Sequence, residues 1–193
     1  MSAKMIEIRW HGRGGQGAKT AALLFAEVVL ATAKKYIQAF PEYGPERMGA
    51  PVQSFNRVSE NPITLHSGVI NPNYIIILEP SLMESVSVTN GIGTTGKIIV
   101  NTSFSSDEIA KKLGIGVNQV YVVNASQIAR ETIGKDIPNT PMLGALIKVI
   151  GILDINDVLE EVKCKLEIKF RHKPEVISGN ILSIKRSFDE VKN

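Results

Sequence analysis

The stretch His11-Gly12-Arg13-Gly14-Gly15-Gln16-Gly17 decides the fold of this chain. It follows a short apolar strand pattern at residues 5–10 and precedes an Ala-rich run at 18–36 that predicts a helix. Three of its glycines have the spacing G-x-G-x-x-G, which between a strand and a helix is typical of phosphate-binding turns. Glycines let a ligand approach the backbone, and the free N–H groups of the helix attract an anion. We therefore predict an anion site at Gly12, Arg13, Gly14, Gly15, Gln16 and Gly17.

The two best-known phosphate sites fit this stretch only in part. A dinucleotide site needs an acidic residue about 20 residues further on, at the tip of the second strand. Here the strand predicted at 36–40 ends at Pro41, and the nearest acid is Glu42. A P-loop needs lysine directly after its last glycine, whereas Ala18 precedes Lys19. A stand-alone NAD(P)-binding Rossmann oxidoreductase stays open as an alternative, as does a tight turn that binds nothing.

Composition bounds the class of protein. The chain has 193 residues, 44% of them hydrophobic and 21% charged, which suits one globular domain spanning 1–193. A net charge of +3, without basic runs interleaved with aromatic residues, argues against nucleic acid, and no apolar run is long enough to cross a membrane. The first residues contain no signal-peptide core. Cys164 is the only cysteine, so the chain alone can form neither a disulfide nor a cysteine-held cluster, and we expect a cytoplasmic protein.

Strand and helix patterns alternate along the first two thirds of the chain. Strands are predicted at 52–58, 63–65, 74–78, 97–101 and 119–123, and helices at 81–88, 106–113 and 126–133. This alternation predicts an open, doubly wound Rossmann-like α/β sheet with helices on both faces. Ligands of such sheets lie at the carboxyl ends of the strands. We therefore expect Glu79, Asn101 and Asn124 to line one edge, although each could also serve only as a cap or turn residue.

The last third of the chain predicts three helices, at 140–151, 154–165 and 173–192. Their apolar residues recur at helical spacing, which favours packing against the rest of the domain or against a partner. The prediction is a C-terminal helical extension, residues 138–193, on an α/β core of residues 1–137.

A second unusual stretch, residues 40–51, contains three prolines and several large or charged side chains. It cannot form a regular element, and Tyr, Arg and Met are enriched at protein interfaces. We predict a subunit interface at Tyr43, Glu46, Arg47 and Met48, with an ordinary crossover between strands as the alternative.

No catalytic or metal site emerges from the sequence. The three histidines, His11, His66 and His172, lie far apart and lack metal-ligand spacing. The G-x-S-x-G nucleophile elbow is also absent. We therefore predict no catalytic residue and no metal ligand on this chain.

Three blocks, at residues 9–19, 38–47 and 138–145, resemble the gamma subunit of 2-oxoacid:ferredoxin oxidoreductases, most closely the pyruvate enzyme. The resemblance covers almost the whole chain. It implies a complex with alpha, beta and delta subunits that converts a 2-oxoacid, coenzyme A and oxidised ferredoxin into acyl-CoA, CO₂ and reduced ferredoxin.

The resemblance also implies where the cofactors of that complex lie. Thiamine diphosphate and Mg²⁺ belong with the alpha and beta subunits, and the [4Fe-4S] clusters with beta and delta. No cofactor is expected on this chain, which also lacks the Gly-Asp-Gly segment that introduces a thiamine diphosphate site. The chain alone should be inactive. The glycine loop is expected to face a phosphate of coenzyme A, and a pure assembly scaffold is the alternative.

Overall fold

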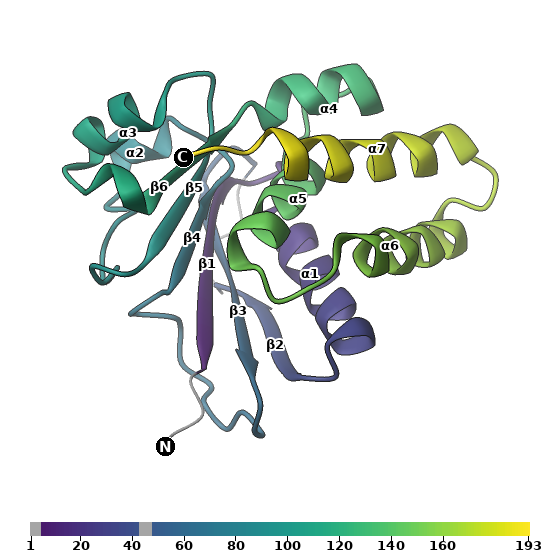
Figure 1. Cartoon of the computed structure of the whole chain (residues 1–193), viewed down its shortest axis with the longest axis horizontal. Coiled ribbons are helices and arrows are strands. Elements are labelled where there is room, and N and C mark those ends of the chain that lie inside the picture. Colours follow the sequence, from purple (N-terminus) through teal and green to yellow (C-terminus); the bar gives the residue numbers. More distant parts are fainter. Residues whose placement is uncertain (1–4, 43–47) are drawn as a thin grey trace.

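The computed structural model describes residues 5–42 and 48–193, which form an open six-stranded sheet with helices on both faces (Figure 1). The strand order is β2-β3-β1-β4-β5-β6. The strands are β1 (Ile6–Arg13), β2 (Tyr36–Pro41), β3 (Pro51–Ser59), β4 (Tyr74–Ile77), β5 (Lys97–Asn101) and β6 (Val120–Val123). The predicted open α/β sheet is confirmed. It is a mixed sheet, because β3 runs antiparallel to both of its neighbours, β2 and β1.

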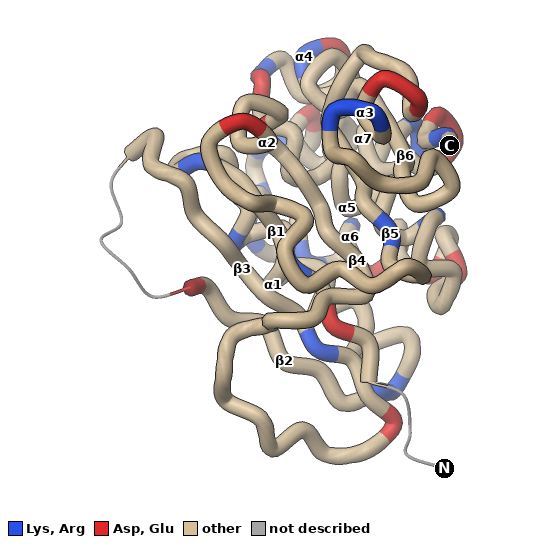
Figure 2. Tube along the Cα trace, turned by 90° about the vertical axis from the view of Figure 1, so that its left-hand side faces the viewer, with Lys and Arg blue, Asp and Glu red and all other residues tan. Residues whose placement is uncertain are grey.

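The side chains of the central parallel strands alternate between two hydrophobic cores. On the first face, Ile76 and Ile99 contact α1 (Ala18–Thr32), α4 (Ala125–Ile133) and α5 (Asn139–Ile150). On the second face, Ile75 and Ile98 pack in one core with α2 (Leu82–Ser85) and α3 (Ser106–Leu113), which lie toward the viewer in Figure 2. A strand buried on both faces has a continuous run of apolar residues, which is why the sequence pattern predicts β4 and β5. A short 3-10 helix, η1 (Val117–Gln119), leads into β6.

Of the three C-terminal helices, only the first lies directly on the sheet. Ten of the twelve residues of α5 are buried, and α5 contributes to the same core as α1. Helices α6 (Ile155–Lys169) and α7 (Pro174–Glu190) form an outer layer on α1 and α5 (Figure 1). The contact between α5 and α7 is close: a Cβ on Gly144 would lie 2.2 Å from the carbonyl oxygen of Ile184. The division of the chain at residue 137 stays a prediction.

A long loop, rather than a helix, covers the second face over β1 and β3. We call residues 60–73 the covering segment. Buried Arg57, 1% exposed, donates to the carbonyls of Ser67 (2.7 Å) and Gly68 (3.1 Å) and pairs with Glu7 (2.8 Å). The strand predicted at 63–65 lies in this segment and is wrong. Its carbonyls accept bonds from side chains, such as Gln38 to Leu65 (3.0 Å), instead of joining a strand ladder.

The structure corrects several helix ends. Helix α1 ends at Thr32 rather than near residue 36, because Lys34 adopts a left-handed φ of 51° before β2 begins. Ser81 and Glu84 have the spacing of a capping box, but no such box forms at the four-residue α2. The observed box is at Ser105 and Glu108 on α3. Asn124 caps α4.

Candidate functional site

The glycine loop joins β1 to α1 with two residues in the left-handed region. Gly15 has a φ of 98° and Gly17, the N-cap of α1, has a φ of 81°. Other residues adopt such angles only with strain. No side chain caps this helix end. The Gln16 side chain instead braces the loop itself, since its Oε1 accepts the Arg13 N–H at 2.8 Å.

The end of the proline-rich stretch lies against this loop. The N–H of Gly14 donates to the carbonyl of Ala50 (2.9 Å), and the N–H of Gly49 donates to the carbonyl of Gly14 (3.1 Å). The sequence did not indicate that these two regions meet. Met48, which directly precedes Gly49, is 95% exposed. The other three predicted interface residues, Tyr43, Glu46 and Arg47, lie outside the described residues.

Arg13 is a clamp in this structure. Its guanidinium donates to the Gly49 carbonyl and to Ser81 Oγ, both at 3.0 Å. It thereby joins the glycine loop to the connection before β3 and to the residue preceding α2. The charge that we predicted for an anion is partly committed to these contacts.

Glu79 links the loop to the carboxyl end of β4. Its Oε2 accepts Gln16 Nε2 at 2.6 Å and its Oε1 accepts the Ser81 N–H at 3.2 Å. Desolvation by burial acts to raise the pKa of this carboxyl, but the bonds from Gln16 and Ser81 and the charge of Arg13 outweigh it and lower the pKa. Glu79 is therefore an ionised strut and a poor candidate for a general acid.

A cavity of about 430 Å³ opens at the start of α1, and we call it the α1 cavity. One wall is the loop and first turn, from Arg13 to Thr20; the other holds Glu42, Met48 and the start of β3. Among the described residues, none accepts a hydrogen bond from the N–H groups of Gly15, Gly17, Ala18, Lys19 or Thr20. A row of free donors at a helix start can bind an anion. Lys19, one residue out of place for a P-loop, is exposed and lines this wall.

The third sequence block also reaches the glycine loop. A Cβ on Gly17 would lie 2.6 Å from Nδ2 of Asn139, the first residue of α5. The Asn139 side chain is held there because its Oδ1 accepts the Thr140 N–H at 2.8 Å. The three blocks that are distant in sequence therefore meet at the carboxyl edge of the sheet. Asn139 carried no sequence signal beyond its place in the third block.

A second cavity, of about 530 Å³, lies beyond the ends of β4, β5 and β6. Glu79, Asn101 and Asn124 all line it, as predicted from their positions after strands. Their side chains are used locally, however. Asn101 bonds to the Leu78 carbonyl and the Ser126 N–H, and Asn124 caps α4. These residues shape the edge of the sheet without presenting free groups to a ligand.

His11 does not touch the glycine loop with its side chain. It is buried on the second face, where its Nε2 accepts Arg9 Nε at 3.0 Å. Desolvation and the neighbouring Arg9 charge lower its pKa to about 3. The imidazole is therefore neutral at physiological pH and serves as a buried acceptor.

Two further observations limit the chemistry. Across residues 5–42 and 48–193, no three His, Cys, Asp or Glu side chains gather as metal ligands would. No helix in those same ranges has both the length and the apolar character that a membrane crossing requires.

The strand order bears on the dinucleotide alternative. Strand β3 lies antiparallel beside β1, at the place where a dinucleotide fold has its second parallel strand. This arrangement counts against the NAD(P)-binding alternative.

Comparison with known proteins gives a consistent set of relatives. Residues 7–190 match the model of the pyruvate ferredoxin/flavodoxin oxidoreductase family. The pyruvate synthase subunit PorC of Thermotoga maritima is 42% identical over 194 residues, which cover 100% of this chain and 97% of that protein. The pyruvate/ketoisovalerate oxidoreductases common subunit gamma of Pyrococcus abyssi is 46% identical over 159 residues, covering 82% and 85%. The crystal structure of pyruvate oxidoreductase subunit PORC from Thermotoga maritima superposes with a TM-score of 0.83 at 40% identity, covering 98% of both chains.

Proposed function

The chain belongs to the pyruvate ferredoxin/flavodoxin oxidoreductase family, and from this premise we propose that it is the gamma subunit of a 2-oxoacid:ferredoxin oxidoreductase complex, with pyruvate as the substrate. The complex would convert the 2-oxoacid, coenzyme A and oxidised ferredoxin into acyl-CoA, CO₂ and reduced ferredoxin. The observation that carries this proposal is the near full-length match to two curated subunits of such enzymes. The cell compartment we propose is the cytoplasm.

The redox chemistry is assigned to the partner subunits, alpha, beta and delta. A [4Fe-4S] cluster takes several cysteine thiolates, and this chain has only Cys164. The described residues also offer no group of carboxylates and histidines for Mg²⁺. Thiamine diphosphate, Mg²⁺ and the clusters would therefore be held elsewhere in the complex, and the isolated chain would be colourless and inactive.

The α1 cavity is our proposed contact with coenzyme A. The N–H groups of Gly15 and of residues 17–20, which have no acceptor among the described residues, and the exposed Lys19 ammonium would hold a phosphate group of the ligand. Glu42 stands on the opposite wall and would repel an anion there, so the phosphate is expected on the helix side. Gln16 and Arg13 would act indirectly, by fixing the loop through Glu79 and Ser81.

The connection before β3 is our proposed contact with a partner subunit. Met48 is almost fully exposed yet lies at the α1 cavity, next to the predicted interface residues Tyr43, Glu46 and Arg47. A partner that covers this connection would also close the cavity. The coenzyme A contact would then be shared between two subunits, in keeping with a subunit that is inactive alone.

The kinetic test uses the complex reconstituted with variants of this chain. Lys19→Ala should raise the KM for coenzyme A about 5- to 30-fold, the loss of a phosphate contact of about 1–2 kcal/mol, with the 2-oxoacid KM unchanged. Arg13→Ala removes a charge and a clamp, so its matched control is Ser81→Ala, which removes the same clamp bond without the charge. Equal effects of Arg13→Ala and Ser81→Ala would assign Arg13 a purely structural role.

Three results would contradict these proposals. An unchanged KM for coenzyme A in an intact Lys19→Ala complex would leave the chain as an assembly scaffold. Failure of the chain to co-purify with thiamine diphosphate- and cluster-containing subunits would refute the assignment as a gamma subunit. Turnover of pyruvate by the chain alone would do the same.

A further inference from the structure

A groove between the outer ends of α6 and α7 is the largest hollow among those described above, at about 780 Å³. Its walls are Cys164, Glu167 and Ile168 from α6, Ile177 from α7 and Arg171 from their connection. Glu167 is paired with Lys163 at 3.9 Å. Ile168 is 82% exposed. Figure 1 shows this helix pair projecting away from the sheet. We call this hollow the α6–α7 groove.

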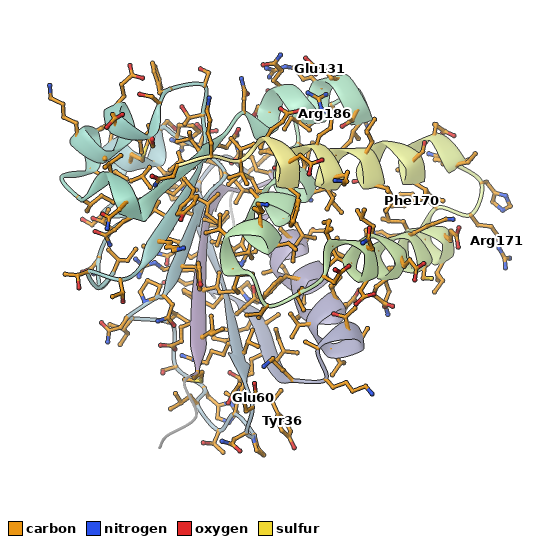
Figure 3. The ribbon with its side chains drawn as sticks, in the orientation of Figure 1. Tyr36, Glu60, Glu131, Phe170, Arg171 and Arg186 are labelled. Carbon is orange, nitrogen blue, oxygen red and sulfur yellow. The ribbon has the colours of Figure 1, made fainter. Side chains whose placement is uncertain are left out.

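Packing against the core is concentrated at the inner ends of the two helices. Val158 and Val162 of α6 are fully buried in the core, and α7 is anchored through Ile184. An ion pair between Arg186 of α7 and Glu131 of α4 (2.7 Å) fixes the same inner end (Figure 3). Beyond residue 163, Leu166 still packs against the core, whereas Ile168 is exposed.

The outer end of this helix pair also carries the net charge of the chain. Residues 163–175, which we call the basic tip, contain five Lys or Arg and two Glu, a formal charge of +3. The whole chain is also +3, so all remaining residues sum to zero. Within the part of the chain that the structure describes, Lys169, Arg171 and Lys173 form no ion pair. Figure 3 places Arg171 and Phe170 at the outer end of the pair.

We propose that the α6–α7 groove receives an acidic amphipathic helix from another polypeptide of the oxidoreductase complex. A helix fits because a third helix laid along two others buries its apolar stripe in their groove. Acidic residues on its flanks would face Lys169, Arg171 and Lys173, and this complementary charge would orient the helix. This inference rests on the proposed function, because it places the partner within that complex.

The same observations disfavour two other occupants. A second copy of this chain would bring two basic tips together, and like charges repel. A membrane surface is better met by several protruding apolar side chains, whereas of the two isoleucines that line this groove Ile168 is exposed and Ile177 is half-buried. The acidic helix is the occupant that fits both the apolar residues of the groove and the basic tip beside it.

Cys164 makes the proposal testable, because it is the only thiol of the chain, is exposed and lines the groove. The rate of its alkylation by a maleimide is measured in the isolated chain and in the complete complex. Burial under a partner helix should slow the reaction by about tenfold or more. A maleimide carrying a photoreactive group, attached at Cys164, should then cross-link the complex to a helical segment rich in Asp and Glu.

Two matched double variants distinguish a loss of charge complementarity from a loss of folding. Lys169→Glu/Arg171→Glu should abolish most of the protection, whereas Lys111→Glu/Lys135→Glu, with the same change of charge on exposed residues elsewhere, should leave it intact. Thermal melting unchanged from that of the parent chain would show that both double variants fold. Protection that survives the charge reversal overturns the acidic partner.

Other outcomes are equally decisive. Equal alkylation rates in the isolated chain and in an intact complex refute the docking site, while the subunit assignment stands. Slowing that depends on the concentration of the isolated chain identifies a second copy instead. Slowing by phosphatidylserine vesicles, without protection in the complex, identifies a membrane contact. Absence of any complex refutes the proposed function itself, which co-purification reports independently.

Discussion

The contact between Gly17 and Asn139 predicts a measurable coupling between two distant sequence blocks. In Gly17→Ala the backbone of the new alanine would have to adopt a φ of 81° and a ψ of 25°. That left-handed conformation costs about 1–2 kcal/mol for a residue with a Cβ. The Cβ would also lie 2.6 Å from Asn139 Nδ2, so the amide must rotate away.

The second cost is set by the hydrogen bond that holds Asn139. Rotation of its amide gives up the 2.8 Å bond to the Thr140 N–H, worth roughly 0.5–1.5 kcal/mol. Gly17→Ala should therefore lower the free energy of unfolding by about 2–3 kcal/mol. Asn139→Ala alone loses the same bond, and in the double variant it cannot be lost twice. The two effects should fall short of additivity by about 1 kcal/mol.

Urea unfolding followed by the fluorescence of Trp10 gives all four free energies, because it is the only tryptophan and is fully buried next to the loop. Gly15→Ala is the matched control: its φ is 98°, but a Cβ there meets nothing within 4 Å. It should be destabilising yet additive with Asn139→Ala. Additivity of Gly17→Ala and Asn139→Ala within about 0.3 kcal/mol would refute the contact between the loop and α5.

Three further outcomes follow from buried polar groups. Asn56→Leu should lower the free energy of unfolding by about 1–3 kcal/mol, measured in urea, because it strands the Trp10 Nε1–H that donates to Asn56 at 2.8 Å. The folded-state pKa of His11, about 3, lies below the ordinary value of 6.5, so its contribution to stability is complete above pH 6.5 and falls as the pH drops toward 3. NMR should accordingly detect no protonation of His11 between pH 8 and 5. Arg57→Lys should speed amide hydrogen exchange in the covering segment, residues 60–73, since a lysine cannot reproduce the forked bonds to its carbonyls; unchanged exchange would count against that clamp.

The sequence predicted the parts of the fold that depend on local pattern. The parallel strands β4, β5 and β6 are short apolar runs between turns, and burial on both faces requires that composition. The pattern could not reveal that β3 inserts antiparallel between β2 and β1, because strand order depends on long-range pairing. The sequence could not predict the covering segment for a similar reason, because its carbonyls accept hydrogen bonds from Arg57, which lies in β3.

The candidate site also combines features that local sequence predicts with features that depend on distant residues. The glycine loop between a strand and a helix follows from local sequence, and two of its glycines, Gly15 and Gly17, adopt the left-handed conformation that glycine tolerates. The roles of Arg13 and Asn139 could not be predicted. Each is decided by a partner far along the chain, Ser81 in one case and Gly17 in the other.

The connection before β3 explains why a dinucleotide-like glycine pattern need not bind a dinucleotide. In that class of site the loop backbone must be free to approach a pyrophosphate. Here the N–H of Gly14 is bonded to Ala50 and the carbonyl of Gly14 accepts the Gly49 N–H, so the middle of the loop is closed by protein. The N–H groups without an acceptor among the described residues are those of Gly15, of Gly17 and of the first turn of α1, since Gln16 donates to the Arg13 carbonyl (3.0 Å). The glycine spacing is thus shared with nucleotide-binding folds, while the exposed part of the loop suits a single phosphate at the helix start beside Lys19.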